Sequence, residues 1–244
     1  MLSFRQFFIL SEAFDTVTEF MLNPQNSDKT YEELINDFEA SGGEILGSGS
    51  YGIVYHHPSW PYVLKVFSWD DPYLKFARYA YTNPHPSFPK FYGPPQRVVP
   101  QYQRYRDEAK QYLARIEMLE PAPPEVFRSM DTDGLLYFHY KKNPGAIKNR
   151  VEYMKLSSKM KALPKEMYNL YEGLYIIKTN ITSTPDLHEG NIMMRKDGQY
   201  VWIDPVWEGP DGTGNPLTAA MTSKDLDQPT LKGGRVKPVR YPIQ

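Results

Sequence analysis

The stretch that decides the fold is Asp186-Leu-His188-Glu-Gly-Asn191, followed by Asp204-Pro-Val206. A predicted hairpin separates the two parts, with strands at 192–194 and 200–203 around an Asp197-Gly198 turn. Two acids and one amide around a hairpin make a compact oxygen-rich site, the ligand type that magnesium prefers. One acid would orient an incoming hydroxyl while Asn191 and Asp204 hold the metal against phosphate oxygens. The alternative is that these side chains only cap turns.

A glycine-rich segment lies upstream, Gly47-Ser-Gly49-Ser-Tyr-Gly52-Ile-Val54. It stands between two predicted strands instead of before a helix, which argues against a Rossmann phosphate loop. Its glycines would let backbone amides approach phosphate groups closely. The alternative is a plain glycine hairpin.

One lysine stands in an otherwise apolar predicted strand, Val63-Leu-Lys65-Val66. Burying an ammonium group costs free energy unless it meets an anion, so Lys65 is expected to meet one. The alternative is an edge-strand lysine whose amine reaches water.

Composition excludes several classes of protein. The 244 residues carry 28 Lys and Arg against 29 Asp and Glu, so net charge gives no argument for binding nucleic acid or membrane. Without cysteine there are no disulfides, thiol nucleophiles or Cys-ligated zinc. The apolar runs are too short to span a bilayer and no secretory signal pattern is present, so we expect a soluble protein.

The hydrophobic pattern predicts helices and strands along most of the chain. Helices are expected at 1–14, 31–40, 71–81 and 164–179. Strands are expected at 45–46, 53–55, 62–67, 88–92 and 112–119. The 22 prolines indicate many turns and few long helices.

These motifs follow the order and spacing of the protein kinase signature, so residues 44–208 resemble the protein-kinase-like superfamily. The resemblance is to the early serine/threonine protein kinases of T-odd podophages in particular. That family has a glycine-rich loop running into a Ser-His-Pro turn, an Asp-Met-His-Ser-Gly-Asn-Ile-Met-like loop and Asp-Pro-Val. Here the corresponding runs are His57-Pro-Ser, Asp186 to Met193 and Asp204 to Trp207.

The resemblance implies ATP and Mg²⁺ as cofactors and gives each motif a role. Ile116 would be the gatekeeper, and backbone groups of Glu117 and Leu119 would bind adenine. Asp186 would be the catalytic aspartate, and Asn191 with Asp204 would hold the metal. The nucleotide-binding residues it implies are Gly47, Gly49, Gly52, Val54, Lys65, Ile116, Glu117 and Leu119.

The chain departs from the kinase pattern at several places. Thr184 and Pro185 replace the His-Arg that precedes the catalytic aspartate, and His188 replaces a lysine. A protonated His188 near the transferring phosphate would offset developing charge, which makes it a third candidate catalytic residue beside Asp186 and Lys65. The usual glutamate partner of Lys65 is missing, so Asp70, Asp71 or a residue elsewhere takes its place. Only 40 residues follow Asp204, too few for the usual peptide-binding lobe.

We therefore predict an α+β, reduced two-lobed protein-kinase-like fold. Residues 41–119 would form a β-rich small lobe and residues 120–208 a truncated helical large lobe, with a leader and helical extension at 1–40 and an irregular tail at 209–244. The predicted function is a phage-encoded serine/threonine protein kinase that modifies host proteins. The alternatives are a small-molecule phosphotransferase of the aminoglycoside or choline kinase type and a pseudokinase that binds a host partner.

The predicted location is the host cytoplasm. Residues 1–13 resemble the head-targeting leaders of internal proteins in T-even-like phages, cleaved after Leu10-Ser-Glu12. The corresponding hypothesis is a protein packaged in the virion head and injected with DNA, and the alternative is a helix that packs on the small lobe. The basic tail at 232–240 is expected to be a solvated end, with no specific nucleic acid partner.

Overall fold

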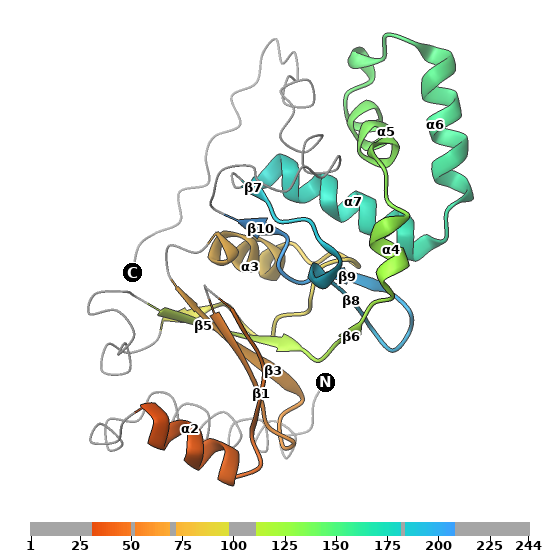
Figure 1. Cartoon of the computed structure of the whole chain (residues 1–244). Helices are drawn as coiled ribbons and strands as arrows, with labels where there is room; N and C mark the ends of the chain where they lie inside the picture. The colour runs from red at the N-terminus through yellow and green to blue at the C-terminus, as the bar shows by residue number, and fades with distance from the viewer. Residues whose placement is uncertain (1–30, 50–51, 69–71, 98–110, 182–183, 208–244) are drawn as a thin grey trace, which may run out of the picture.

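The computed structural model describes residues 31–49, 52–68, 72–97, 111–181 and 184–207. An antiparallel sheet lies at one end, a group of helices lies at the other, and a short hairpin lies between them (Figure 1). The described part is therefore a mixed α and β structure. None of its helices is long and apolar enough to cross a membrane. The predicted leader helix at 1–14 and the tail at 209–244 lie outside the described residues.

The five-stranded sheet has the order β1-β2-β3-β5-β4, with every neighbouring pair antiparallel. Its strands are β1 (Glu44–Gly49), β2 (Gly52–His56), β3 (Tyr62–Ser68), β4 (Gln96–Arg97) and β5 (Gln111–Glu117). Val54 lies opposite Lys65, which lies opposite Ala114 on its other side, so these three residues share one face of the sheet. The predicted strands at 45–46, 53–55 and 62–67 are confirmed.

Helix α2 (Tyr31–Ala40) contacts the opposite face of the sheet. Its Phe38 packs with a small core that contains Tyr55, Trp60, Tyr62, Leu64, Val66 and Leu113. The helix ends at Ala40, and Gly42 follows with a φ of +96°, in the left-handed region that favours glycine. A Cβ on Gly43 would lie 2.4 Å from the Phe38 ring, so this close approach also needs glycine. The predicted helix and its glycine ending are confirmed.

Helix α3 (Tyr73–Thr82) packs against the face of the sheet that carries Lys65. The rings of Phe67 and Tyr73 meet edge to face, with their centres 4.9 Å apart. Phe76 and Ala77 are fully buried behind them. These residues belong to the larger core, which continues from the sheet through α3 into the helices at the far end.

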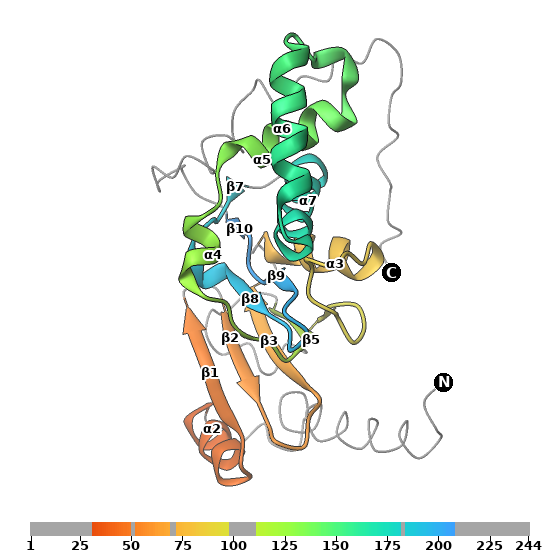
Figure 2. The same cartoon turned by 90° about the vertical axis from the view of Figure 1, so that its right-hand side faces the viewer.

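The far end consists of α4 (Pro124–Arg128), α5 (Thr132–Lys142), α6 (Arg150–Ala162) and α7 (Lys165–Asn180). The side chains of Asp131 and Asn149 accept hydrogen bonds from backbone N–H groups at the starts of α5 and α6. Leu135 and Leu174 are fully buried, in the core that α5 shares with α7. Figure 2 shows α5 and α6 well away from strands β1–β3.

The hairpin of β8 (Ile192–Met194) and β9 (Tyr200–Trp202) lies between the sheet and α7. Its turn contains Gly198 at φ +87°, as the Asp-Gly signal predicts. Trp202 is fully buried and donates its indole N–H to the carbonyl of Leu170 in α7, at 3.0 Å. Strand β6 (Glu120–Pro121) pairs with β8 and so joins the end of the sheet to the hairpin.

One predicted strand is wrong. Residues 88–92 form no strand and make only an isolated bridge between Phe91 and Ile116. Pro89 has no N–H to donate, and Gly93-Pro-Pro follows at once, so regular pairing cannot continue in either direction. The strand expected at 112–119 is β5, which ends two residues earlier, at Glu117.

Candidate active site

The glycine-rich segment forms the turn end of β1 and β2. Gly49 pairs with Gly52, and Gly47 pairs with Val54, while residues 50 and 51 at the tip lie outside the described residues. A Cβ on Gly52 would come within 2.6 Å of the Val66 carbonyl oxygen, so the fold itself needs glycine there. A Cβ on Gly47 would meet nothing within 4 Å. The open space over Gly47 can therefore admit a ligand close to the backbone.

Lys65 extends from β3 to the end of the hairpin. Its Nζ lies 2.6 Å from Oδ2 of Asp204, and its side chain is only 12% exposed. The same ammonium group lies 3.5 Å from the centre of the Tyr73 ring, a cation–π contact. The partner that the sequence left open is thus Asp204, 139 residues away, while Asp70 and Asp71 lie outside the described residues.

Backbone hydrogen bonds hold the two acidic segments together. The short strands β7 (Thr184–Pro185) and β10 (Val206–Trp207) are paired antiparallel. Just beyond this pair, the Asp186 N–H donates to the Pro205 carbonyl at 3.0 Å. The Ile203 N–H donates to the Asn191 carbonyl, also at 3.0 Å. Main-chain hydrogen bonds therefore bring Asp186, Asn191 and Asp204 close together.

The Asn191 side chain can bind a metal ion through its amide oxygen. It is only 6% exposed, and its amide nitrogen donates to the Asp186 carbonyl at 2.8 Å. That bond turns the amide group so that Oδ1 is left as a ligand atom, and Asp204 keeps a second carboxylate oxygen beyond the one that Lys65 uses. Within the described residues no three His, Asp or Glu side chains gather as a metal site. The Asn191 and Asp204 oxygens nevertheless fit Mg²⁺, which is bound through few protein groups together with substrate phosphates.

His188 lies next to Asp186 in the loop before the short 3₁₀ helix η4 (Glu189–Asn191). Its Nδ1 accepts from the Gly190 N–H at 3.1 Å. The Nε2 atom lies 3.7 Å from Oδ2 of Asp186. Because Nδ1 is an acceptor here, the proton of the neutral ring is on Nε2, the side that faces Asp186.

The predicted adenine-binding segment lies at the end of β5. Ile116 is buried opposite Val63 in the register of β3 and β5, and this pair is on the same sheet face as Lys65. The Glu117 N–H donates to the Lys90 carbonyl, so only the carbonyl of Glu117 is left to meet a base. Leu119 follows as a partly exposed residue between β5 and β6.

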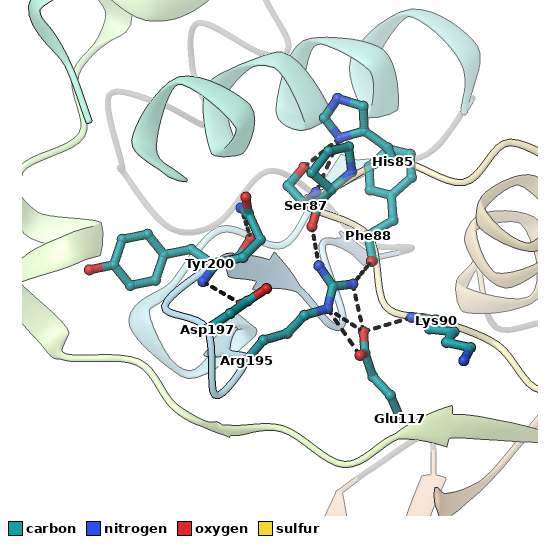
Figure 3. Close-up of polar contacts among 10 residues, drawn as sticks. His85, Ser87, Phe88, Lys90, Glu117, Arg195, Asp197 and Tyr200 are labelled. Carbon is teal, nitrogen blue, oxygen red and sulfur yellow. Dashed lines mark hydrogen bonds and ion pairs between the residues drawn. The ribbon is translucent and has the colours of Figure 1, made fainter. Parts of the chain in front are cut away.

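Sequence reasoning missed two contacts of the site. The ring of Tyr73 lies beneath the Lys65 ammonium group. Arg195, which follows β8 in the hairpin, donates to the carboxylate of Glu117 at the end of β5 (Figure 3). Val63 and Ala114 also lie on the sheet face that carries Lys65. The two sheet residues could have been found from the alternation of residues around Lys65, because i and i+2 share a face. Neither Tyr73 nor Arg195 carries a local signal of its role.

Comparisons with known proteins leave the family open. No protein family model matches the chain, and no curated protein matches it. A solved structure of vaccinia related kinase 3 is similar at 11% sequence identity and a TM-score of 0.30, over 65% of this chain and 44% of that one. The chain thus spans less than half the length of that kinase. The functional assignment therefore depends on the residues and contacts described above.

Proposed function

We propose that the protein is an ATP- and magnesium-dependent phosphotransferase that moves the γ-phosphoryl group to a hydroxyl. The observation that carries this proposal is the 2.6 Å contact between Lys65 and Asp204 beside the Asp186 and Asn191 pair. A lysine from a sheet, two aspartates and an asparagine are the parts that kinase catalysis uses. Their retention together argues against a pseudokinase.

The nucleotide would lie on the sheet face that carries Val54, Val63 and Ile116. In this proposal the chain has two lobes, residues 41–119 and 120–208, and ATP would lie between them. The glycine segment would cover the phosphates, and the carbonyl of Glu117 with the backbone of Leu119 would meet adenine. Lys65 would release one Asp204 oxygen and donate to phosphate oxygens instead.

The transfer itself uses Asp186. It accepts a hydrogen bond from the acceptor hydroxyl and takes its proton as the new bond forms between that oxygen and the γ-phosphorus. The bond from γ-phosphorus to the β-phosphate bridging oxygen breaks, and ADP leaves. The Nε2–H of His188 faces Asp186, so we assign His188 to orienting that carboxylate. Magnesium, when bound by Asn191 and Asp204, would offset the charge on the phosphate oxygens.

The acceptor that we propose is a serine or threonine of a host protein, in a phage-encoded enzyme acting in the host cytoplasm. This part comes from the sequence resemblance alone. Small-molecule hydroxyls are the competing acceptor, since the Asp-x-His-x-x-Asn pattern of Asp186 to Asn191 also occurs in aminoglycoside and choline phosphotransferases.

The test is incubation with γ-labelled ATP and magnesium, with a bacterial lysate and separately with a panel of small-molecule alcohols. Wild type is compared with Asp204→Ala and with Asp197→Asn. The latter changes an acid in the turn of the same hairpin, whose carboxylate accepts from the Gln199 N–H. Label on protein bands in wild type and Asp197→Asn, lost in Asp204→Ala, supports a protein kinase. Label on small molecules supports the competing acceptor, and no transfer to either overturns the proposal.

A further inference from the structure

Arg195 joins three separate segments of the chain (Figure 3). Its Nε lies 3.0 Å from each carboxylate oxygen of Glu117, and its Nη2 donates to Oε1 of Glu117 at 2.6 Å. Nη2 also donates to the Phe88 carbonyl at 2.7 Å, and Nη1 to the Pro86 carbonyl at 2.5 Å. Every nitrogen of the guanidinium group is thus engaged.

Glu117 is held equally firmly. Its Oε1 accepts from the Lys90 N–H at 2.8 Å, and its own N–H donates to the Lys90 carbonyl at 2.9 Å. The Glu117 side chain is 15% exposed and that of Arg195 is 23% exposed, so water screens the pair little. A planar guanidinium fork and a carboxylate in this geometry make a directional, charge-assisted contact that a lysine cannot reproduce.

The position of this Arg195–Glu117 network relative to the candidate site is what gives it a function. Glu117 is the last residue of β5 and begins the segment that would bind adenine. Arg195 directly follows β8, the strand that begins next to the metal-binding Asn191. The network therefore links the segment that would bind adenine to the hairpin next to the loop that would hold the metal.

The hairpin has other attachments that hold it in the fold. The Trp202 N–H donates to the Ser87 carbonyl, its indole N–H donates to Leu170, and β6 pairs with β8. What only Arg195 adds, among the described contacts of the hairpin, is a hold on the Glu117 side chain. We infer that Arg195 is a positioning residue for nucleotide binding, acting through Glu117. This inference rests on the proposed function.

The experiment measures the Kd of a fluorescent ATP analogue with magnesium, and the KM and kcat of transfer, for Arg195→Lys, Glu117→Gln and the double variant. Each single variant should raise the Kd and the KM for ATP about tenfold, which is a typical factor by which one site changes the affinity of another. The kcat should change less than about threefold. The double variant should be no worse than either single one, because the two residues act through one contact. Lys159→Ala is the matched control. Its ion pairs with Asp131 and Asp133 lie at the start of α5, are about 45% exposed and should leave Kd unchanged.

Thermal unfolding of each variant separates positioning from loss of the fold. If Arg195→Lys does not fold, the near-isosteric Glu117→Gln decides the question on its own. Wild-type Kd in the folded variants, or a loss confined to kcat, overturns the inference while leaving the proposed function intact. An analogue that binds no variant, wild type included, overturns the proposed function and the inference with it.

Discussion

The two ends of the candidate nucleotide site are held in place by different means. At the phosphate end, main-chain hydrogen bonds bring Asp186, Asn191 and Asp204 together, and the Asn191 and Lys65 side chains add further contacts. At the base end, the Glu117 carboxylate is held by the Arg195 side chain, which is 78 positions away in sequence, and by the Lys90 N–H. The phosphate end should therefore keep its shape when one side chain is changed, and the base end should not.

This difference separates catalysis from affinity. Single substitutions at the phosphate end should remove a chemical group while its neighbours stay where the backbone puts them. Substitutions in the Arg195–Glu117 network should move the base-binding segment as a whole.

Asp186→Asn should lower kcat by about a thousandfold, because the amide cannot take the hydroxyl proton. Nucleotide Kd should stay within twofold of wild type, since the Asp186 N–H still donates to Pro205. Steady-state kinetics and analogue binding give the two numbers. Turnover within tenfold of wild type would refute the catalytic role of Asp186, and a large loss of binding would refute a backbone-held phosphate end.

Lys65→Met should lower kcat/KM about a hundredfold, the usual cost of removing one group that stabilises transition-state charge. Lys65→Arg keeps the charge and should recover part of the loss. The measurement is initial rate against ATP concentration for both variants. Equal activity of Lys65→Met and wild type would mean that the contact with Asp204 has only a structural role.

Tyr73→Leu should lower kcat/KM between threefold and tenfold, because the ring beneath the Lys65 ammonium is lost and a cation–π contact is worth about 0.5–2 kcal/mol. Tyr73→Phe keeps a ring at this position and is the control. Activity and thermal unfolding should be measured together, since Tyr73 is fully buried. A Phe variant as impaired as the Leu variant would show that the hydroxyl, and not the ring, supports Lys65.

The smallest effect is expected away from both ends, in α5. Burial lowers the pKa of His139, and the positive charge of Lys178 lowers it further. Above about pH 6.5 the ring is mostly neutral in both the folded and the unfolded state. As the pH falls below that value, the unfolded state takes up the proton before the folded state does, because the pKa of His139 is lowered in the folded state. The free energy of unfolding should then decrease as the pH falls, by at most about 1.4 kcal/mol per pH unit.

Denaturant unfolding between pH 5 and 8 measures this dependence. His139→Leu should flatten this decrease in the free energy of unfolding, because it removes the titrating ring. The substitution breaks no hydrogen bond of the buried Nδ1, which has no partner among the described residues. His85, whose pKa burial also lowers, should keep part of the slope. An unchanged slope in His139→Leu would mean that His139 does not contribute.

The sequence predicted the phosphate end better than the base end for a physical reason. Glycines, a lone lysine in a strand and the Asp and Asn residues around a hairpin are local signals, because each marks a backbone or solvation requirement at its own position. The Lys65 partner and the Arg195–Glu117 network depend on chain segments 139 and 78 positions apart, which no periodic pattern encodes.

The helical end was predicted only in outline. Helix α7 could be placed because apolar residues recur along it, whereas α6 buries only Leu156 and Met160 and leaves Val151 and Met154 exposed. In a helix with so few buried apolar residues, the 3.6-residue spacing of hydrophobic residues is hard to recognise in the sequence. The predicted strand at 88–92 failed because its apolar residues pack into the core from an irregular segment that Pro89 interrupts.

Magnesium-dependent ATP binding is tested most directly by calorimetric titration of the wild-type protein and Asp204→Ala with ATP, each with and without magnesium. We expect one ATP to bind per chain and magnesium to strengthen that binding at least tenfold in wild type, with the magnesium effect lost in Asp204→Ala. Absence of ATP binding, or binding that neither magnesium nor the Asp204 substitution changes, would contradict it.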